Sequence, residues 1–89
     1  MNDLELIKAF AEIDGVKVIE EWSCTYDKNT ALEYNPITDL ALNCAARDKY
    51  RVEIDYYVKE ATIDCESSAF IIDSRIGRAV IECIVKANK

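Results

Sequence analysis

The chain has 89 residues, of which 51% are hydrophobic and 31% charged, a balance typical of a globular protein rather than a disordered one. This length predicts one domain, residues 1–89, with a modest core and little room for a deep substrate cleft. Seventeen acidic residues against eleven basic ones give a net charge of -6. The balance argues against direct nonspecific binding of nucleic acid, which needs clustered Lys and Arg, and permits binding to a basic protein surface.

The residue types present exclude several other classes of activity. The chain has no histidine, the usual general base at neutral pH, and its two glycines cannot form a glycine-rich phosphate loop. We therefore expect no enzyme activity and no cofactor. No apolar run reaches the roughly 18–20 residues of a membrane span, and the N-terminus lacks the features of a secretory signal. A cytoplasmic protein without a membrane partner is expected.

The four cysteines, taken alone, do not predict a metal site. They lie about twenty residues apart, without the close-set ligand pairs of zinc sites: Cys24, Cys44, Cys65 and Cys83. A reducing cytosol also disfavours disulfides, so ordinary thiols are expected. Three of them fall on apolar stripes, whereas Cys24 lies in a polar segment and is the cysteine to suspect of reactivity.

A helix is predicted over residues 3–14 by apolar side chains at three- and four-residue spacing. These side chains are Leu6, Ile7, Phe10 and Ile13. Asn2 or Asp3 can cap the first amides of this helix. Gly15 is placed to end it in a left-handed conformation.

A strand, an exposed loop and a second helix are expected next. Residues 16–23 look like a strand, with one face made by Val16, Val18 and Trp22, and the polar segment 24–33 looks like a loop. Pro36 disfavours helix at the residue before it, and Thr38 can cap a helix that runs to about Lys49. The apolar strip of this helix is Leu40, Ala41, Cys44 and Ala45.

The segments 51–58 and 61–66 alternate apolar and polar residues with period two, as half-buried strands do. A hairpin that turns at Lys59-Glu60 would pair them. The face expected under the helices is then Val52, Ile54, Tyr56, Val58 and Ile63. On the other face this register sets Asp55 opposite Asp64 and Glu53 opposite Glu66. Like charges directly across a strand pair are destabilising, so the acidic face invites a functional explanation.

The last part of the chain predicts a turn at Ser67-Ser68, a short buried strand over residues 69–72 and a helix capped by Asp73 or Ser74. The apolar stripe of this helix is Ile76, Val80, Cys83, Ile84 and Ala87. Further apolar residues, Ile81 and Val85, lie off that stripe. A helix that is apolar nearly all round is either deeply buried or part of an interface, so a homodimer through this helix or through an edge strand is one expectation.

The order of these elements is helix, strand, helix, strand, strand, strand, helix. It predicts an α+β fold, a small sandwich in which three helices cover a mixed or antiparallel sheet of about four strands.

Three segments of the chain have a family-like pattern: Leu4-x-x-Ile7-x-x-Phe10-Ala11-Glu12-Ile13, Tyr34-Asn35-Pro36-Ile37-Thr38-Asp39 and Arg78-Ala79-Val80-Ile81-Glu82-Cys83-Ile84-Val85-Lys86-Ala87. In this order they resemble the phage ABA sandwich domain. The resemblance spans most of the chain, but the segment 24–33 and the acidic hairpin depart from it. It implies a helix-sheet-helix sandwich encoded by a phage or prophage, hence in the cytoplasm of a bacterial host, and it brings no catalytic residues.

Two interpretations of the acidic hairpin face stay open. It is either a solvated surface, whose charges Arg51 and Lys59 offset diagonally, or a binding surface in which an aromatic side chain lies among charges. The binding interpretation predicts a protein-binding site made by Glu53, Asp55, Tyr57, Asp64 and Glu66.

With the phage resemblance, the binding interpretation predicts a non-enzymatic protein that inhibits a host defence complex, in the manner of an anti-CRISPR protein, by occupying a basic nucleic-acid-binding surface. The alternative is a self-associating accessory or structural phage protein without such a target.

Overall fold

The computed structural model describes residues 1–64 and 66–88. In chain order the elements are α1 (Asp3–Asp14), β1 (Val18–Glu21), β2 (Cys24–Asp27), α2 (Leu40–Tyr50), β3 (Glu53–Asp55), β4 (Glu60–Ile63), β5 (Glu66–Ala69), the short 3-10 helix η1 (Asp73–Arg75) and α3 (Ile76–Ala87). The fold is α+β, as predicted. The described strands, however, form two antiparallel sheets of two and three strands, not one sheet of about four.

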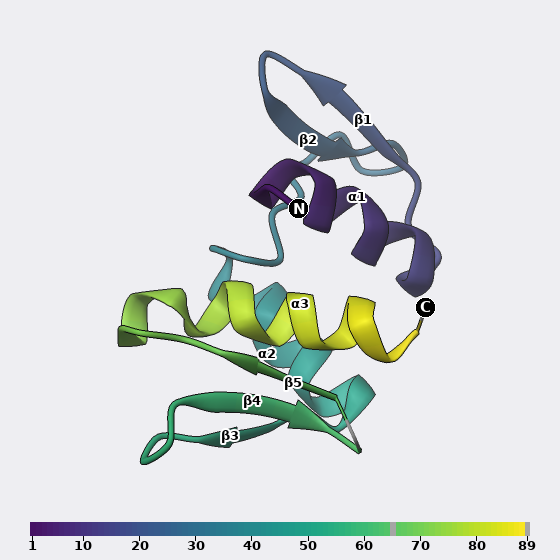
Figure 1. Ribbon diagram of the computed structural model, residues 1–89. Coiled ribbons are helices and arrows are strands. Elements are labelled where there is room, and N and C mark those ends of the chain that lie inside the picture. Colours follow the sequence, from purple (N-terminus) through teal and green to yellow (C-terminus); the bar gives the residue numbers. More distant parts are fainter. Residues whose placement is uncertain (65, 89) are drawn as a thin grey trace.

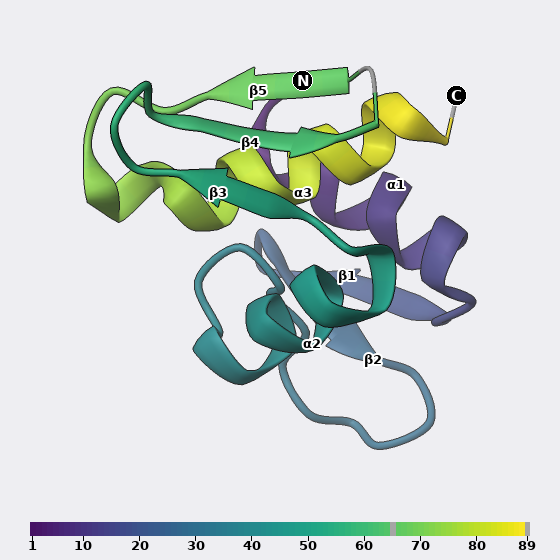
Figure 2. The same ribbon diagram turned by 90° about the horizontal axis from the view of Figure 1, so that it is seen from below.

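Helix α3 lies at the centre of the molecule. Figure 1 shows it between α1 and the three-stranded sheet, with the β1–β2 hairpin beyond α1 at the opposite end of the molecule from that sheet. Figure 2 shows β3, β4 and β5 side by side against α3. One face of the three-stranded sheet therefore covers α3, and no described helix or strand covers the other face. Among the described helices, none is long and apolar enough to cross a membrane.

Helix α1 has the caps that its sequence predicts. The Asn2 carboxamide accepts from the Glu5 amide at 2.8 Å, and the Glu5 carboxylate accepts from the Asn2 amide at 3.2 Å, which makes a capping box. Gly15 ends the helix in the left-handed region, with φ 75°. The predicted apolar face is confirmed for Leu6, Ile7 and Phe10, which are buried, and Ile13 is partly buried.

The segment expected to be a loop contains strand β2, so that prediction is wrong over residues 24–27. Thr25 anchors this strand: its hydroxyl donates to the Tyr34 carbonyl at 2.6 Å, and the Tyr34 amide donates to the Thr25 carbonyl at 2.8 Å. The predicted placement of Trp22 on one strand face with Val16 and Val18 is also wrong. Trp22 belongs to the turn between β1 and β2, and 92% of its surface is exposed.

Helix α2 begins where expected, but its cap and its buried face differ from the prediction. Asp39, not Thr38, accepts from the first amides of the helix. The predicted apolar strip is exposed at every position: Leu40, Ala41, Cys44 and Ala45. The helix instead buries Asn43 and Ala46, and the Asn43 side-chain amide donates to the Pro36 carbonyl at 2.7 Å and to the Gly77 carbonyl at 3.1 Å. Because Asn43 is polar and Gly77 lies 34 residues away in the sequence, apolar periodicity could not reveal that Asn43 faces inward.

The strand predicted over residues 69–72 is wrong, as is the turn at Ser67-Ser68. Strand β5 contains both serines, and the turn before it includes Asp64, which has φ 50°. Ser68 is buried because its hydroxyl donates to the Glu82 carboxylate on α3. The chain leaves the sheet after Ala69, and Ile71 is then 86% exposed rather than buried.

Helix α3 is buried on several sides, which accounts for its wide apolar surface. It packs against α1, α2, β4 and β5. Ile81 and Val85, which lie off the predicted stripe, are 0% and 4% exposed. Burial within the protomer therefore accounts for these two side chains, and the homodimer stays a prediction. The predicted side-chain cap is also absent: Asp73 lies in η1, and Arg75 occupies the cap position of α3 without a side-chain hydrogen bond.

Candidate functional site

The acidic hairpin pairs in a register different from the predicted one. The predicted pairs of Asp55 with Asp64 and of Glu53 with Glu66 are wrong. In the structure the pairs between β3 and β4 are Glu53 with Thr62, Ile54 with Ala61 and Asp55 with Glu60. Only one like-charge pair, different from both predicted ones, lies across these two strands.

The reason for this register is a longer turn. The Asp55 carboxylate accepts hydrogen bonds from the amide of Tyr57 at 2.9 Å and from the amide of Val58 at 3.1 Å, which closes an Asx-type turn. Lys59 completes the turn with φ 59°. A two-residue turn at Lys59 and Glu60, of the kind favoured in hairpins, would also need positive φ at a non-glycine residue. It would lack the two hydrogen bonds that Asp55 accepts in the longer turn.

Three carboxylates lie together on the uncovered side of the sheet. Alternation along the paired strands places Glu53, Asp55 and Glu60 on one face, which we call the outer carboxylate face. A shallow hollow of about 340 Å³ lies beside them, lined also by Tyr56 and Thr62 among others. Glu60 was missed because the predicted turn included it. The local signal that could have placed Glu60 in β4 was Asp55, because an aspartate can accept from the amides two and three residues later and so close a turn before Glu60.

The other two predicted acidic site residues lie elsewhere. Asp64 is in the turn that follows β4, and Glu66 pairs with Ile63 on the opposite face of the sheet. Tyr57 is in the turn before β4 and is 96% exposed. The structure thus brings Glu53 and Asp55 together with Glu60, and leaves Asp64 and Glu66 outside this group.

An exposed apolar cluster borders the outer carboxylate face. The turn before β4 and the segment after β5 meet at this end of the sheet: the Phe70 amide donates to the Lys59 carbonyl at 2.9 Å, and the Lys59 ammonium donates to the Ile71 carbonyl at 3.2 Å. Figures 1 and 2 both show the two segments at one end of the molecule. The exposed side chains, which we call the apolar end, are Tyr56, Tyr57, Val58, Ile71 and Ile72.

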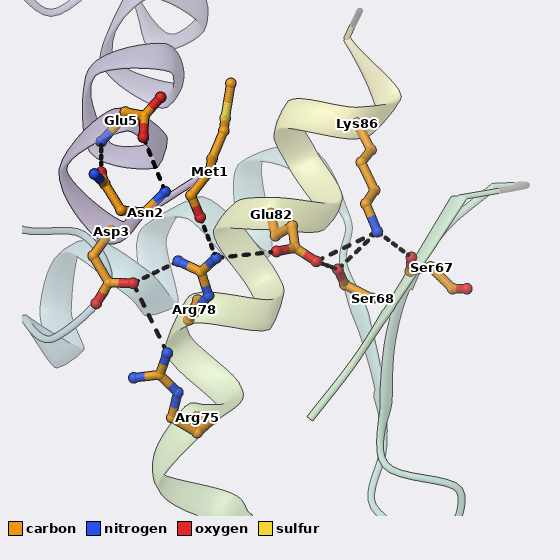
Figure 3. A network of polar contacts seen from close by, with 10 residues as sticks. All are labelled: Met1, Asn2, Asp3, Glu5, Ser67, Ser68, Arg75, Arg78, Glu82 and Lys86. Atoms are coloured by element: carbon orange, nitrogen blue, oxygen red, sulfur yellow. Dashed lines mark hydrogen bonds and ion pairs between the residues drawn. The ribbon is translucent and has the colours of Figure 1, made fainter. Parts of the chain in front are cut away.

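The basic residues of α3 are occupied by other partners, as Figure 3 shows. Arg78 donates to the Asp3 carboxylate at 2.5 Å, and Glu82 lies 3.5 Å from Arg78 and 3.4 Å from Lys86. The hydrogen bond from Ser68, followed by Lys86 and Arg78, lowers the pKa of Glu82, although partial burial opposes this shift. These cations therefore tie the N-terminus, α3 and β5 together and do not neutralise the outer carboxylate face.

The cysteines differ from one another in their surroundings. Cys83 is buried, as predicted, and burial raises the pKa of its thiol. Cys44 is exposed, which contradicts its predicted apolar position, and Cys24 is half-buried in β2 rather than in a loop. Cys65 lies outside the described residues. Within residues 1–64 and 66–88, no three or more Cys, Asp or Glu side chains gather closely enough to hold a metal ion.

Comparison of the chain with models of known protein families, with curated proteins and with solved structures gave no match. The resemblance to the phage ABA sandwich domain therefore stays a prediction.

Proposed function

We propose that the protein is a non-enzymatic binding protein that docks its outer carboxylate face on a basic protein surface. The surface that it would occupy is one that otherwise holds nucleic acid, since phosphates and carboxylates are both attracted by clustered Lys and Arg. For a phage or prophage protein, such a target would belong to a host defence complex, and the protein would inhibit it as an anti-CRISPR protein does.

The observation that carries this proposal is the open, negatively charged side of the three-stranded sheet. Glu53, Asp55 and Glu60 form no ion pair with any described residue, whereas several carboxylates elsewhere do. Asp55 and Glu60 lie directly opposite each other, and their repulsion slightly lowers the stability of the isolated protein. A basic partner would relieve this repulsion. Tyr57, almost fully exposed beside them, supplies the aromatic contact that interface centres favour.

Self-association is the second candidate, and the apolar end favours it. Five large apolar side chains exposed at one end of a small domain are an unusual surface for a monomer. An accessory phage protein that assembles through this end would bury Tyr57 and Ile71 against a second copy. Sedimentation at increasing protein concentration tests this candidate, because only self-association makes the mass depend on the concentration of the protein alone.

Affinity capture from bacterial lysate tests the first candidate. The variant Glu53→Gln with Glu60→Gln removes two charges at nearly constant side-chain size and leaves the turn bonds of Asp55 intact. The matched control is Glu12→Gln with Asp48→Asn, which removes two charges at exposed positions of α1 and α2. We expect the wild type and the control to retain a basic nucleic-acid-binding complex, more weakly as salt rises, and the outer-face variant to lose it.

Two results would contradict the proposal. One is capture of the same proteins by all three baits, which would make the outer carboxylate face an ordinary solvated surface. The other is a captured complex that still binds its nucleic acid with unchanged affinity when saturated with this protein.

A further inference from the structure

The turn between β1 and β2 has a backbone conformation that its residues do not favour. Glu21 pairs with Cys24, so Trp22 and Ser23 alone form the turn, and their φ angles are 54° and 62°. Positive φ at both positions is the type I′ turn, for which Asn-Gly is the preferred sequence. A bulky residue such as tryptophan in the left-handed region is a conformational outlier, because its Cβ crowds the following carbonyl.

Folding does not explain why a tryptophan occupies this position. The Trp22 side chain is 92% exposed, so burial of the indole within the protein does not offset the backbone strain. Trp22 is also the only tryptophan of the chain. Strained backbone positions cluster at functional sites, and tryptophan is among the residues enriched as anchors of protein interfaces.

The rest of the hairpin presents an outward surface around this anchor. Its inner side packs toward α1 through Val18 and the buried Thr25. On the outer side, Ile19 is exposed opposite Tyr26. A shallow hollow of about 410 Å³ opens there, lined by Ile19, Glu21, Tyr26, Asp27, Lys28 and Ala31. The hairpin therefore combines an exposed indole at its tip with a hollow on its outer side that a partner side chain can enter.

The charges of the hairpin indicate a basic partner. Its acidic residues outnumber its basic ones: Glu20, Glu21, Asp27 and Glu33 against Lys17 and Lys28. Glu20 pairs with Lys8 of α1, whereas Glu21, next to Trp22, forms no ion pair with a described residue. A second copy of the chain, which also carries a net charge of -6, would repel this tip.

We propose that the β1–β2 tip is a second binding surface, on which Trp22 inserts its indole into an apolar pocket of a partner protein whose rim carries Lys or Arg. Figure 1 places this tip at the opposite end of the molecule from the outer carboxylate face. The two surfaces are therefore separable, and the chain can hold two partner surfaces at once.

The first part of the test uses the isolated protein. The variant Trp22→Asn with Ser23→Gly installs the preferred turn sequence, so its thermal midpoint should rise by about 4 °C or more. A lower midpoint would show that Trp22 stabilises the fold and would overturn the proposal.

Since Trp22 is the only tryptophan, its fluorescence reports the tip directly. Relative to their effect on free N-acetyltryptophanamide, caesium ions should quench it more and iodide ions less, because the tip is acidic. The emission should not shift with protein concentration; a concentration-dependent blue shift would assign the tip to a second copy instead.

The second part identifies the partner by difference. Lysate capture is compared between the wild type, the Trp22→Asn/Ser23→Gly variant and Trp22→Phe, which keeps an aromatic anchor. We expect a basic protein that the first variant loses and Trp22→Phe partly retains. Once purified, that protein should shift the Trp22 emission to the blue, and the Asn-Gly variant should bind it about 30-fold more weakly or worse. The proposal is overturned if all three baits capture the same proteins, or if none of them captures any protein.

The Glu53→Gln/Glu60→Gln variant separates this proposal from the preceding one. It should bind the Trp22 partner with the affinity of the wild type. A loss of that partner on changing the outer carboxylate face would mean that one continuous interface, not a second surface, had been found.

Discussion

The close contact between Gly77 and the segment before α2 predicts that Gly77→Ala destabilises the protein, although helix propensity alone predicts the opposite. Gly77 is the second residue of α3, and alanine favours a helix over glycine by about 1 kcal/mol. On propensity alone, Gly77→Ala should therefore stabilise the protein. A Cβ added at this position, however, would lie 2.1 Å from the Ile37 carbonyl oxygen, far inside the 3.0 Å below which such contacts are essentially never seen.

The Ile37 carbonyl cannot retreat easily, because its neighbours are held. The Asn35 side chain accepts from the Ile37 amide at 3.2 Å, and Asn43 donates to both the Pro36 carbonyl and the Gly77 carbonyl. Overpacking of this kind costs about 1–3 kcal/mol, and loss of one of the Asn43 hydrogen bonds adds about 1 kcal/mol. After the gain in helix propensity, we expect Gly77→Ala to lower the free energy of unfolding by roughly 1–3 kcal/mol.

Urea denaturation followed by far-UV circular dichroism measures this change. The midpoint should fall while the slope stays constant, since the same surface is exposed on unfolding. Gly15→Ala is the matched control: Gly15 has φ 75° but no atom within 4 Å of an added Cβ, so only the backbone penalty of about 1–2 kcal/mol applies. A Gly77→Ala protein as stable as the wild type, or more stable, would refute the close approach of α3 to the Ile37 carbonyl.

Three further predictions concern single side chains. Glu82→Gln should lower the thermal midpoint at pH 7, because the interactions that lower the pKa of Glu82 stabilise the folded protein. This stabilisation is present above about pH 4.3 and is lost as the pH falls through the folded-state pKa. A difference in midpoint between variant and wild type that stays the same in acid would contradict this. Tyr34→Phe should leave the midpoint at pH 7 unchanged or raise it, since the buried Tyr34 hydroxyl has no partner among the described residues. Burial raises the pKa of Tyr34, so wild type should lose extra stability above about pH 10 that the variant keeps, as pH-dependent melting would show. Glu60→Gln should leave the free energy of unfolding unchanged or raise it by a few tenths of a kcal/mol, because it removes the repulsion by Asp55; a clear loss in urea denaturation would mean that Glu60 has a stabilising partner.

Features that depend on neighbouring residues were predictable from the sequence. The capping box of Asn2 and Glu5 and the left-handed Gly15 involve groups within a few residues of each other, so the bounds of α1 were predicted correctly. The alternation in the acidic hairpin predicted the inner face correctly for Ile54 and Ile63, which are partly buried. It was wrong for Tyr56 and Val58, which lie in the turn between β3 and β4 and are exposed. The predicted register differs from the observed one by four residues, and an even shift changes the partners of a strand without turning its side chains to the other face.

The assembly of the candidate site depended on contacts between distant parts of the chain. Apolar spacing could not show that α2 buries Asn43, because the carbonyl that it binds on Gly77 lies 34 residues away. It could not show that Ser68 belongs to a strand, since its hydrogen-bond partner Glu82 is on α3. Composition and local pattern therefore determined the α+β class, the helices and the acidic character of the hairpin. Which carboxylates share a face, and which apolar residues stay exposed, was decided only by packing around α3, because burial is a property of the neighbours that tertiary structure brings together.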